Sequence, residues 1–245
     1  MRVTKTFDVD KAIYSVRSFD IRNLSETQFD AAMPMGNVAK FCVNSVAKAG
    51  FVGLFEEVRD VLPRCVDWLR NSIDSRESFG ETMEFHLSMW NQALALANWM
   101  QDGSINEGAC GAAVREDQAA IAISNSIYPA KKLKTLRLDH VMPMAVLAGS
   151  YEVAISEYEA VDGAVTSKAP KASPRRYAYG VARFRRGLQE FPDLQSMGDT
   201  VIAKNMDEYL AYGNFIEAAT LVCLVRSKVE GSRDAVGSLR SAIGR

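Results

Sequence analysis

The spacing of apolar residues restricts the fold of this chain more than any other feature of its sequence. Between residues 51 and 73, large apolar side chains recur at three- and four-residue steps, which places them on one face of a helix. Pro63 lies inside this run, so we expect the helix to kink or to divide there. Two-residue alternation, the pattern of a half-buried strand, is scarce along the chain. The spacing therefore predicts an all-α protein.

The stretch WNQALALANW, residues 90–99, predicts a helix that neighbours contact from several directions. Apolar residues cover two of its sides, as in a helix at the centre of a bundle. Ser78 and Glu81 precede it with the spacing of a capping box, and Ser104 and Glu107 repeat that spacing before an alanine-rich run. We therefore expect two successive helices, each capped by its serine.

Three segments share a plan in which a helix ends at a glycine, an aromatic residue follows within two positions, and an acidic amphipathic helix begins. The glycines are Gly50, Gly149 and Gly213. Glycine relieves the strain of the left-handed turn that ends a helix. The unequal spacing of the three excludes an array with a fixed period of about 34 residues. We expect irregular antiparallel helical hairpins, with tetratricopeptide-like elbows but no strict repeat, around one core.

The second half of the chain contains the clearest linker. Residues 162–176, DGAVTSKAPKASPRR, contain few large apolar groups, and we expect a mobile loop there. Before it, a helical run resumes after Pro129 and is interrupted at Pro143; after it, an arginine-rich helix runs near Gly180 to Glu190. With 245 residues, of which 48% are hydrophobic, the chain can fill one sizeable core. We expect a single helical domain over residues 1–245.

Composition narrows the classes of partner. The 29 Lys and Arg balance 30 Asp and Glu, which argues against a surface built for nucleic acid. The first residues carry frequent charges and no apolar segment, so we expect no signal peptide, no membrane span and a cytoplasmic location. The four cysteines, Cys42, Cys65, Cys110 and Cys223, lie far apart in apolar runs, which favours buried thiols over disulfides or a zinc site.

Motifs that would carry catalysis are scarce. The two histidines, His86 and His140, each lie in a helical run without a metal-ligand or triad spacing around them, which favours structural roles. No HExxH, CxxC, GxSxG or Walker-type spacing occurs. We therefore expect no enzyme activity, no metal and no cofactor. An enzyme would need a pocket that gathers scattered Asp, His and Arg residues and perturbs their pKa values.

An acidic stripe is the first candidate surface for a partner. Glu56, Asp60, Asp67 and Asp74 fall opposite the apolar face of the helical run if the helix continues through Pro63. Such a stripe is either an ordinary solvated face or a docking surface for a basic protein, since complementary charge raises association rate and specificity.

An arginine-rich segment is the second candidate surface. In SPRRYAYGVARFRRG, aromatic residues interleave with Arg175, Arg176, Arg183, Arg185 and Arg186. This mixture suits a solvated basic face, a protein contact or a nucleic-acid contact. An acidic stripe and a basic patch on one molecule favour a protein partner.

The order of these pieces resembles the helical immunity proteins encoded beside bacterial polymorphic toxins, in particular the immunity protein 49 family. The resemblance rests on a short extended opening TFDVDKA, an N-terminal helix, a helical stretch from Ser25 to Gly50, the segment WNQALALANW, and a late hairpin at Gly213 and Phe215. It extends loosely over most of the chain, although the segment at 162–176 and the arginine-rich run after it have no counterpart.

The resemblance implies a cytoplasmic protein that binds the catalytic domain of a cognate toxin and occludes its active site, without catalysis or a cofactor of its own. A standard interface of roughly 1,600 Å² is large enough to cover an active-site cleft. The alternatives are a helical-hairpin adaptor that binds a peptide in a concave groove, and an enzyme with a site of scattered Asp, His and Arg residues.

Overall fold

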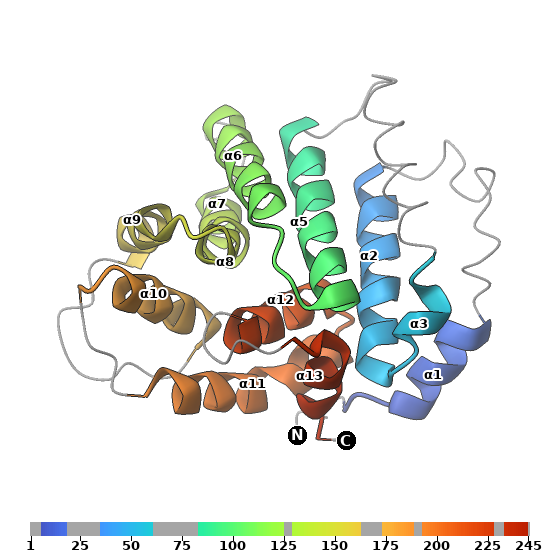
Figure 1. Ribbon diagram of the computed structural model, residues 1–245. Coiled ribbons are helices and arrows are strands. Elements are labelled where there is room, and N and C mark those ends of the chain that lie inside the picture. The colour runs from blue at the N-terminus through green and yellow to red at the C-terminus, as the bar shows by residue number, and fades with distance from the viewer. Residues whose placement is uncertain are drawn as a thin grey trace, which may run out of the picture.

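The computed structural model describes residues 6–18, 35–60, 83–124, 129–162, 173–188, 193–227 and 233–244 (Figure 1). Every regular element in these ranges is a helix, and no strand occurs among them. The predicted all-α class is confirmed. None of the described helices combines the length and the apolar character that a bilayer crossing needs.

The N-terminal part contains the helices α1 (Val9–Ser18), α2 (Met35–Val52) and α3 (Phe55–Val58). The expectation of an extended opening TFDVDKA is wrong for its second half, because α1 begins within it. Asp8 starts the helix, since its side-chain Oδ1 accepts a hydrogen bond from the Lys11 N–H at 3.0 Å.

The first predicted elbow lies three residues later than expected. Gly50 is an interior residue of α2, and the turn is made by Gly53, whose φ is 77°. The Leu54 N–H donates to the Ala49 carbonyl at 2.8 Å, which closes the end of the helix. A Cβ added at Gly50 would lie 2.8 Å from Cδ1 of Leu239, so Gly50 serves close packing. The helix predicted to run unbroken from residue 51 to Pro63 is interrupted at Gly53.

The next two helices, α5 (Met83–Asp102) and α6 (Glu107–Ser124), form a hairpin beside α2 (Figure 1). Leu96 and Trp99 of α5 are fully buried, and α5 contacts α2, α6, α12 and α13. The prediction that several neighbours contact this helix is confirmed. The predicted cap at Ser104 is wrong: α6 starts at Glu107, and Asn106 caps it by accepting the Ala109 N–H at 2.9 Å. The spacing Ser78–Glu81 lies outside the described residues.

The expected interruption at Pro143 does not occur, because the helix changes its winding. It continues from α7 (Ala130–Thr135) through the π-helix η3 (Leu136–Val141) into α8 (Met142–Leu147). A proline inside an α-helix removes one hydrogen bond and crowds the carbonyl four residues earlier, which here belongs to Asp139. The wider π turn, in which the Met142 N–H donates to the Arg137 carbonyl, accommodates the ring.

The two later elbows are where the glycine pattern predicted them. Gly149 separates α8 from α9 (Tyr151–Asp162), and Gly213 separates α11 (Leu194–Ala211) from α12 (Phe215–Val225). Their φ angles are 74° and 76°. In each, the residue after the glycine donates its N–H to a carbonyl five positions earlier at 2.8 Å, as in a Schellman cap.

The linker predicted at 162–176 is too wide at both ends. Asp162 belongs to α9, and α10 (Pro174–Arg185) begins inside the expected loop, so the arginine-rich helix starts earlier than predicted. Ser173 accepts the Arg176 N–H on its side chain, and the proline after it suits the first helical position. Residues 163–172 lie outside the described part of the chain.

The helix α12 lies at the centre of the molecule (Figure 1). Every residue of α12 except Glu217 is buried, and it contacts α2, α5, α8, α11 and the last helix, α13 (Ala235–Ser241). One cluster of buried apolar side chains extends from α2 to α13. Cys110 and Cys223 are buried thiols within it, as predicted; of the other two cysteines, Cys65 and the Cys42 side chain lie outside the described atoms.

Candidate functional site

Two members of the predicted acidic stripe lie on the described surface. Glu56 pairs with Arg59 at 2.5 Å, and the same guanidinium lies 3.7 Å from Asp60. The carboxylates of Glu56 and Asp60 are 73% and 91% exposed, so these ion pairs contribute little to stability. Arg59 offsets part of their negative charge. Asp67 and Asp74 lie outside the described residues.

Most of the predicted basic patch is paired with acids of the same chain. Arg175 forms a bidentate pair with Asp139 of η3, with both nitrogen–oxygen distances at 2.6 Å. Arg183 lies 3.4 Å from Glu159 of α9, and Arg186 pairs with Glu152. These pairs fasten α10 to the two helical segments before it.

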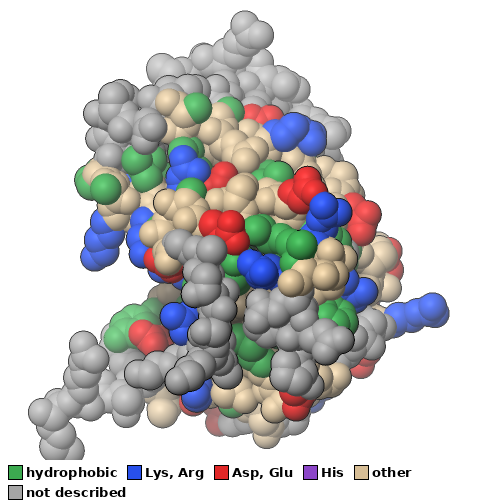
Figure 2. Space-filling view, turned by 90° about the vertical axis from the view of Figure 1, so that its left-hand side faces the viewer, with side chains coloured by type: hydrophobic (Ala, Val, Ile, Leu, Met, Phe, Trp, Pro, Cys, Tyr) green, Lys and Arg blue, Asp and Glu red, His purple; other side chains and the backbone are tan. Residues whose placement is uncertain are grey.

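The remaining two arginines of the patch lie at opposite ends of α10. Arg176 is partly buried in the first turn of α10, and Arg185 is exposed at its other end. Figure 2, which faces the side of α9 and α10, shows basic and acidic side chains intermixed over the described surface. These arginine–acid pairs could not be predicted from local sequence, because the acidic partners lie 24 to 36 residues before their arginines.

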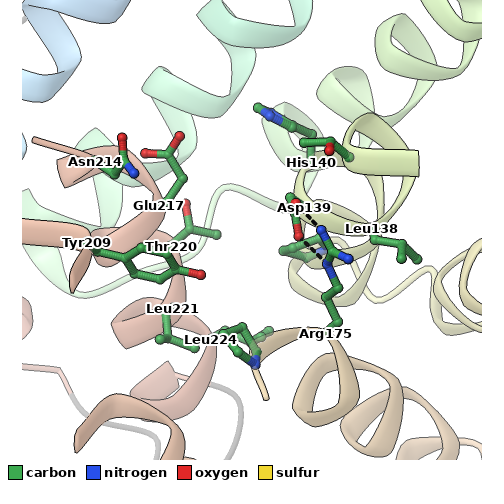
Figure 3. A pocket seen from close by; sticks show the side chains of 13 residues that line it. Leu138, Asp139, His140, Arg175, Tyr209, Asn214, Glu217, Thr220, Leu221 and Leu224 are labelled. Carbon is green, nitrogen blue, oxygen red and sulfur yellow. Dashed lines mark hydrogen bonds and ion pairs between the residues drawn. The ribbon is translucent and has the colours of Figure 1, made fainter. Parts of the chain in front are cut away.

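The Asp139–Arg175 pair forms one wall of a cavity of about 260 Å³ between η3, α10, α11 and α12 (Figure 3). Two consecutive polar residues of the π-helix η3, Asp139 and His140, line the cavity. π turns are frequent at functional sites, because they change where side chains point without ending the helix. The cavity has the following lining: Thr135, Leu138, Asp139, His140, Pro143, Pro174, Arg175, Tyr209, Asn214, Glu217, Thr220, Leu221 and Leu224.

The opposite wall is one face of α12. Glu217, Thr220, Leu221 and Leu224 follow the three- and four-residue steps that bring side chains onto one helical side. Oε2 of Glu217 is shielded from solvent and finds no hydrogen-bond partner among the described residues. The Thr220 hydroxyl accepts a bond from the side-chain amide of Gln92 at 3.4 Å. An acidic oxygen without a donor is costly to bury, which makes Glu217 the most unusual group in the cavity.

Tyr209 projects into the same space from α11 (Figure 3). Burial raises the pKa of its phenol to about 12, and the negative charges of Asp139 and Glu217 act in the same direction. Arg175 opposes them in part. The phenol therefore keeps its proton at neutral pH, and it serves as a hydrogen-bonding group rather than a base.

His140 connects the cavity with a buried acid of α6. Asp117 is only 2% exposed, and burial raises its pKa to about 6, against the opposing attraction of His140 and a hydrogen bond with Ser88. Its Oδ1 has no hydrogen-bond partner in the described part of the chain. The cavity and its surroundings thus hold a histidine and a perturbed acid, which are the features that an enzyme would require.

Sequence reasoning identified only part of this site. His140 was expected to be structural, and Arg175 was assigned to a surface patch; Asp139, Tyr209 and Glu217 were not singled out. A proline inside an otherwise helical run, shortly after an Asp-His pair, was the one local signal available. No group of three or more His, Cys, Asp or Glu with the geometry of a metal site occurs among the described residues.

Comparison with known proteins gives no indication of function, so a functional proposal must be based on the geometry of the surface and the cavity. Neither a family model, nor a curated protein, nor a solved structure matches this chain.

Proposed function

We propose that this protein is an immunity-type binding protein that neutralises a cognate bacterial toxin domain by covering its active site. The observation that carries the proposal is an apolar and basic surface at the C-terminal end of α10, here called the α10 end patch. Phe184 is 45% exposed and Leu188 is 56% exposed, and Arg185 lies between them in the sequence. Exposed aromatic and arginine side chains are enriched at protein interfaces.

The α10 end patch has a rigid support. Tyr179 of α10 stacks on Tyr158 of α9 with ring centroids 4.2 Å apart, and its hydroxyl donates to Glu159 at 2.7 Å. The Arg183 guanidinium lies 5.6 Å from the centre of the Tyr179 ring. A surface that is ordered before binding loses less conformational entropy on association, which favours tight inhibition. The intramolecular arginine pairs thus support the proposed contact surface, and Phe184 and Leu188 supply its apolar contacts.

Co-expression with a toxin domain tests this proposal. The toxin would be the variable C-terminal domain encoded beside this chain's gene, and the readouts would be growth protection and the dissociation constant of the purified complex. Replacing Phe184 with Asp should weaken binding at least roughly 30-fold, as expected for a central interface residue. Tyr14→Asp is the matched control, because Tyr14 is an aromatic that is 73% exposed on α1. Undiminished protection by Phe184→Asp, or no protection by the wild type, would reject the proposal.

The cavity favours an enzyme as the second candidate. His140 at its rim, close enough to interact electrostatically with the perturbed Asp117, suits general acid–base chemistry. A screen of hydrolase and transferase substrates tests this candidate with the wild type and His140→Ala. An activity that the variant loses while its thermal stability is preserved supports an enzyme; an activity that survives in His140→Ala excludes His140 from the chemistry.

A further inference from the structure

We infer that the cavity between η3, α10, α11 and α12 binds a primary ammonium group on a short apolar stem. The carboxylate of Glu217, which lines the cavity and whose Oε2 has no hydrogen-bond partner in the described part of the chain, would receive the ammonium, and the leucine and proline side chains of the lining would hold the stem. This inference is independent of the proposed toxin contact. The cavity lies at the N-terminal end of α10, about ten residues and roughly 15 Å along the helix from Phe184.

Charge accounts for the preference for a cation. Asp139 is neutralised by its two hydrogen bonds to Arg175, whereas Glu217 has no basic partner among the described residues. Burial is the main cause of the raised pKa of the Tyr209 phenol, and the negative charge of Glu217 adds to it, while Asp139 and Arg175 act on it in opposite directions. An anionic ligand would meet this uncompensated carboxylate, while an ammonium would compensate it.

Hydrogen-bonding capacity favours an ammonium over other cations. An ammonium group has three N–H donors and no acceptor. The carboxylate of Glu217, the hydroxyl of Thr220 and the hydroxyl of Tyr209 are three acceptors that line the same space (Figure 3). The Thr220 hydroxyl accepts one hydrogen bond from Gln92 at 3.4 Å, and a hydroxyl oxygen has a second lone pair for a ligand. A guanidinium is planar and needs a fork of acceptors, and the acid best placed to provide one, Asp139, is already occupied by Arg175.

The apolar part of the lining limits the stem. The apolar residues of the lining include Leu138, Leu221, Leu224, Pro143 and Pro174. A volume of about 260 Å³ admits a small molecule or one side chain. The same chemistry occurs in a free alkylamine and in the side chain of a lysine presented by a partner protein, so the experiment must separate these two sources.

The test is an NMR titration of the full chain with pentylamine, with pentanol as the neutral control and Nα-acetyl-lysine methylamide as the lysine probe. We expect pentylamine to shift resonances around α12 with a dissociation constant on the order of 1 mM, a value suited to its size, and pentanol to bind at least about tenfold more weakly. Binding of pentylamine alone identifies a free amine as the source. Binding of the lysine probe with equal or higher affinity identifies a protein side chain.

Matched variants connect the binding to Glu217. Glu217→Gln should weaken pentylamine binding about tenfold, because it removes the charge and keeps the shape. Glu208→Gln removes an equal charge from an exposed residue beside Tyr209 that does not line the cavity, and it should leave the affinity unchanged. Tyr209→Phe provides a second test should the Glu217→Gln variant fail to fold. Equal affinity for pentylamine and pentanol, or undiminished binding by both cavity variants, would overturn the inference.

Discussion

Replacing Asp117 with Asn should remove a pH-dependent cost to the stability of this protein. Asp117 is 2% exposed, and its pKa is about 6 in the folded chain, against an ordinary value of 3.8. Below pH 3.8 the carboxyl is protonated in both the folded and the unfolded chain, so folding carries no charge penalty. Between pH 3.8 and about 6 the unfolded chain ionises first, and the free energy of unfolding falls.

The size of the effect follows from the two pKa values. A rise from 3.8 to about 6 corresponds to about 3 kcal/mol, at roughly 1.4 kcal/mol for each pKa unit. Above pH 6 the wild type should therefore be less stable than Asp117→Asn by up to that amount, and near pH 4 the two should be nearly equal. The negative charge of Glu116 adds to the rise, while His140 and Ser88 limit it.

Urea unfolding at several pH values between 4 and 7.5, followed by circular dichroism, measures this difference. The comparison with the variant is essential, because other acids titrate in the same range. Their contributions to the free energy of unfolding are common to both proteins and cancel in the difference. Asp207→Asn, a change at an exposed acid of α11, is the control and should give a difference that does not depend on pH. A wild-type minus Asp117→Asn difference that stays constant, or that favours the wild type as the pH rises, would refute the reasoning.

Three further predictions concern stability and use the same unfolding assay. Arg175→Lys replaces a bidentate pair with a single contact and should cost about 1 kcal/mol; an unchanged midpoint would mean that the second hydrogen bond to Asp139 contributes nothing. Asn106→Ala should cost about 1 kcal/mol and Ser104→Ala clearly less, because the asparagine caps α6. A larger loss of stability in Ser104→Ala than in Asn106→Ala would instead indicate that the serine is the cap. Gly213→Ala forces a side chain into a left-handed turn and should cost about 1 kcal/mol, whereas Gly111→Ala, inside α6, should stabilise by up to about 1 kcal/mol. Equal effects of the two glycine changes would contradict this account.

The fold class could be predicted because it depends on periodicity within single segments. Apolar residues at helical steps specify helices wherever the chain lies, and Gly149 and Gly213 were identified as elbows because each is followed by an aromatic residue and an acidic start. Errors occurred where two local signals competed. Gly50 and Gly53 both offered a helix end, and Asn106 lay two residues after a plausible serine cap. In the folded chain Gly50 lies inside α2, where Leu239 packs so closely that a side chain at this position would crowd it.

The sequence by itself determined that this chain is helical and where most of its helices lie. Only the tertiary structure decided what its charged residues do. From the sequence, Arg175 is predicted to belong to a basic surface, but in the fold η3 places Asp139 beside it. Glu217 is an ordinary first-turn acid in the sequence, but in the fold it belongs to a helix that is otherwise buried. Helical periodicity acts over a few residues, whereas ion pairs and cavities join residues that are far apart in the chain. The α10 end patch and the ammonium site are therefore visible only once the helices have packed.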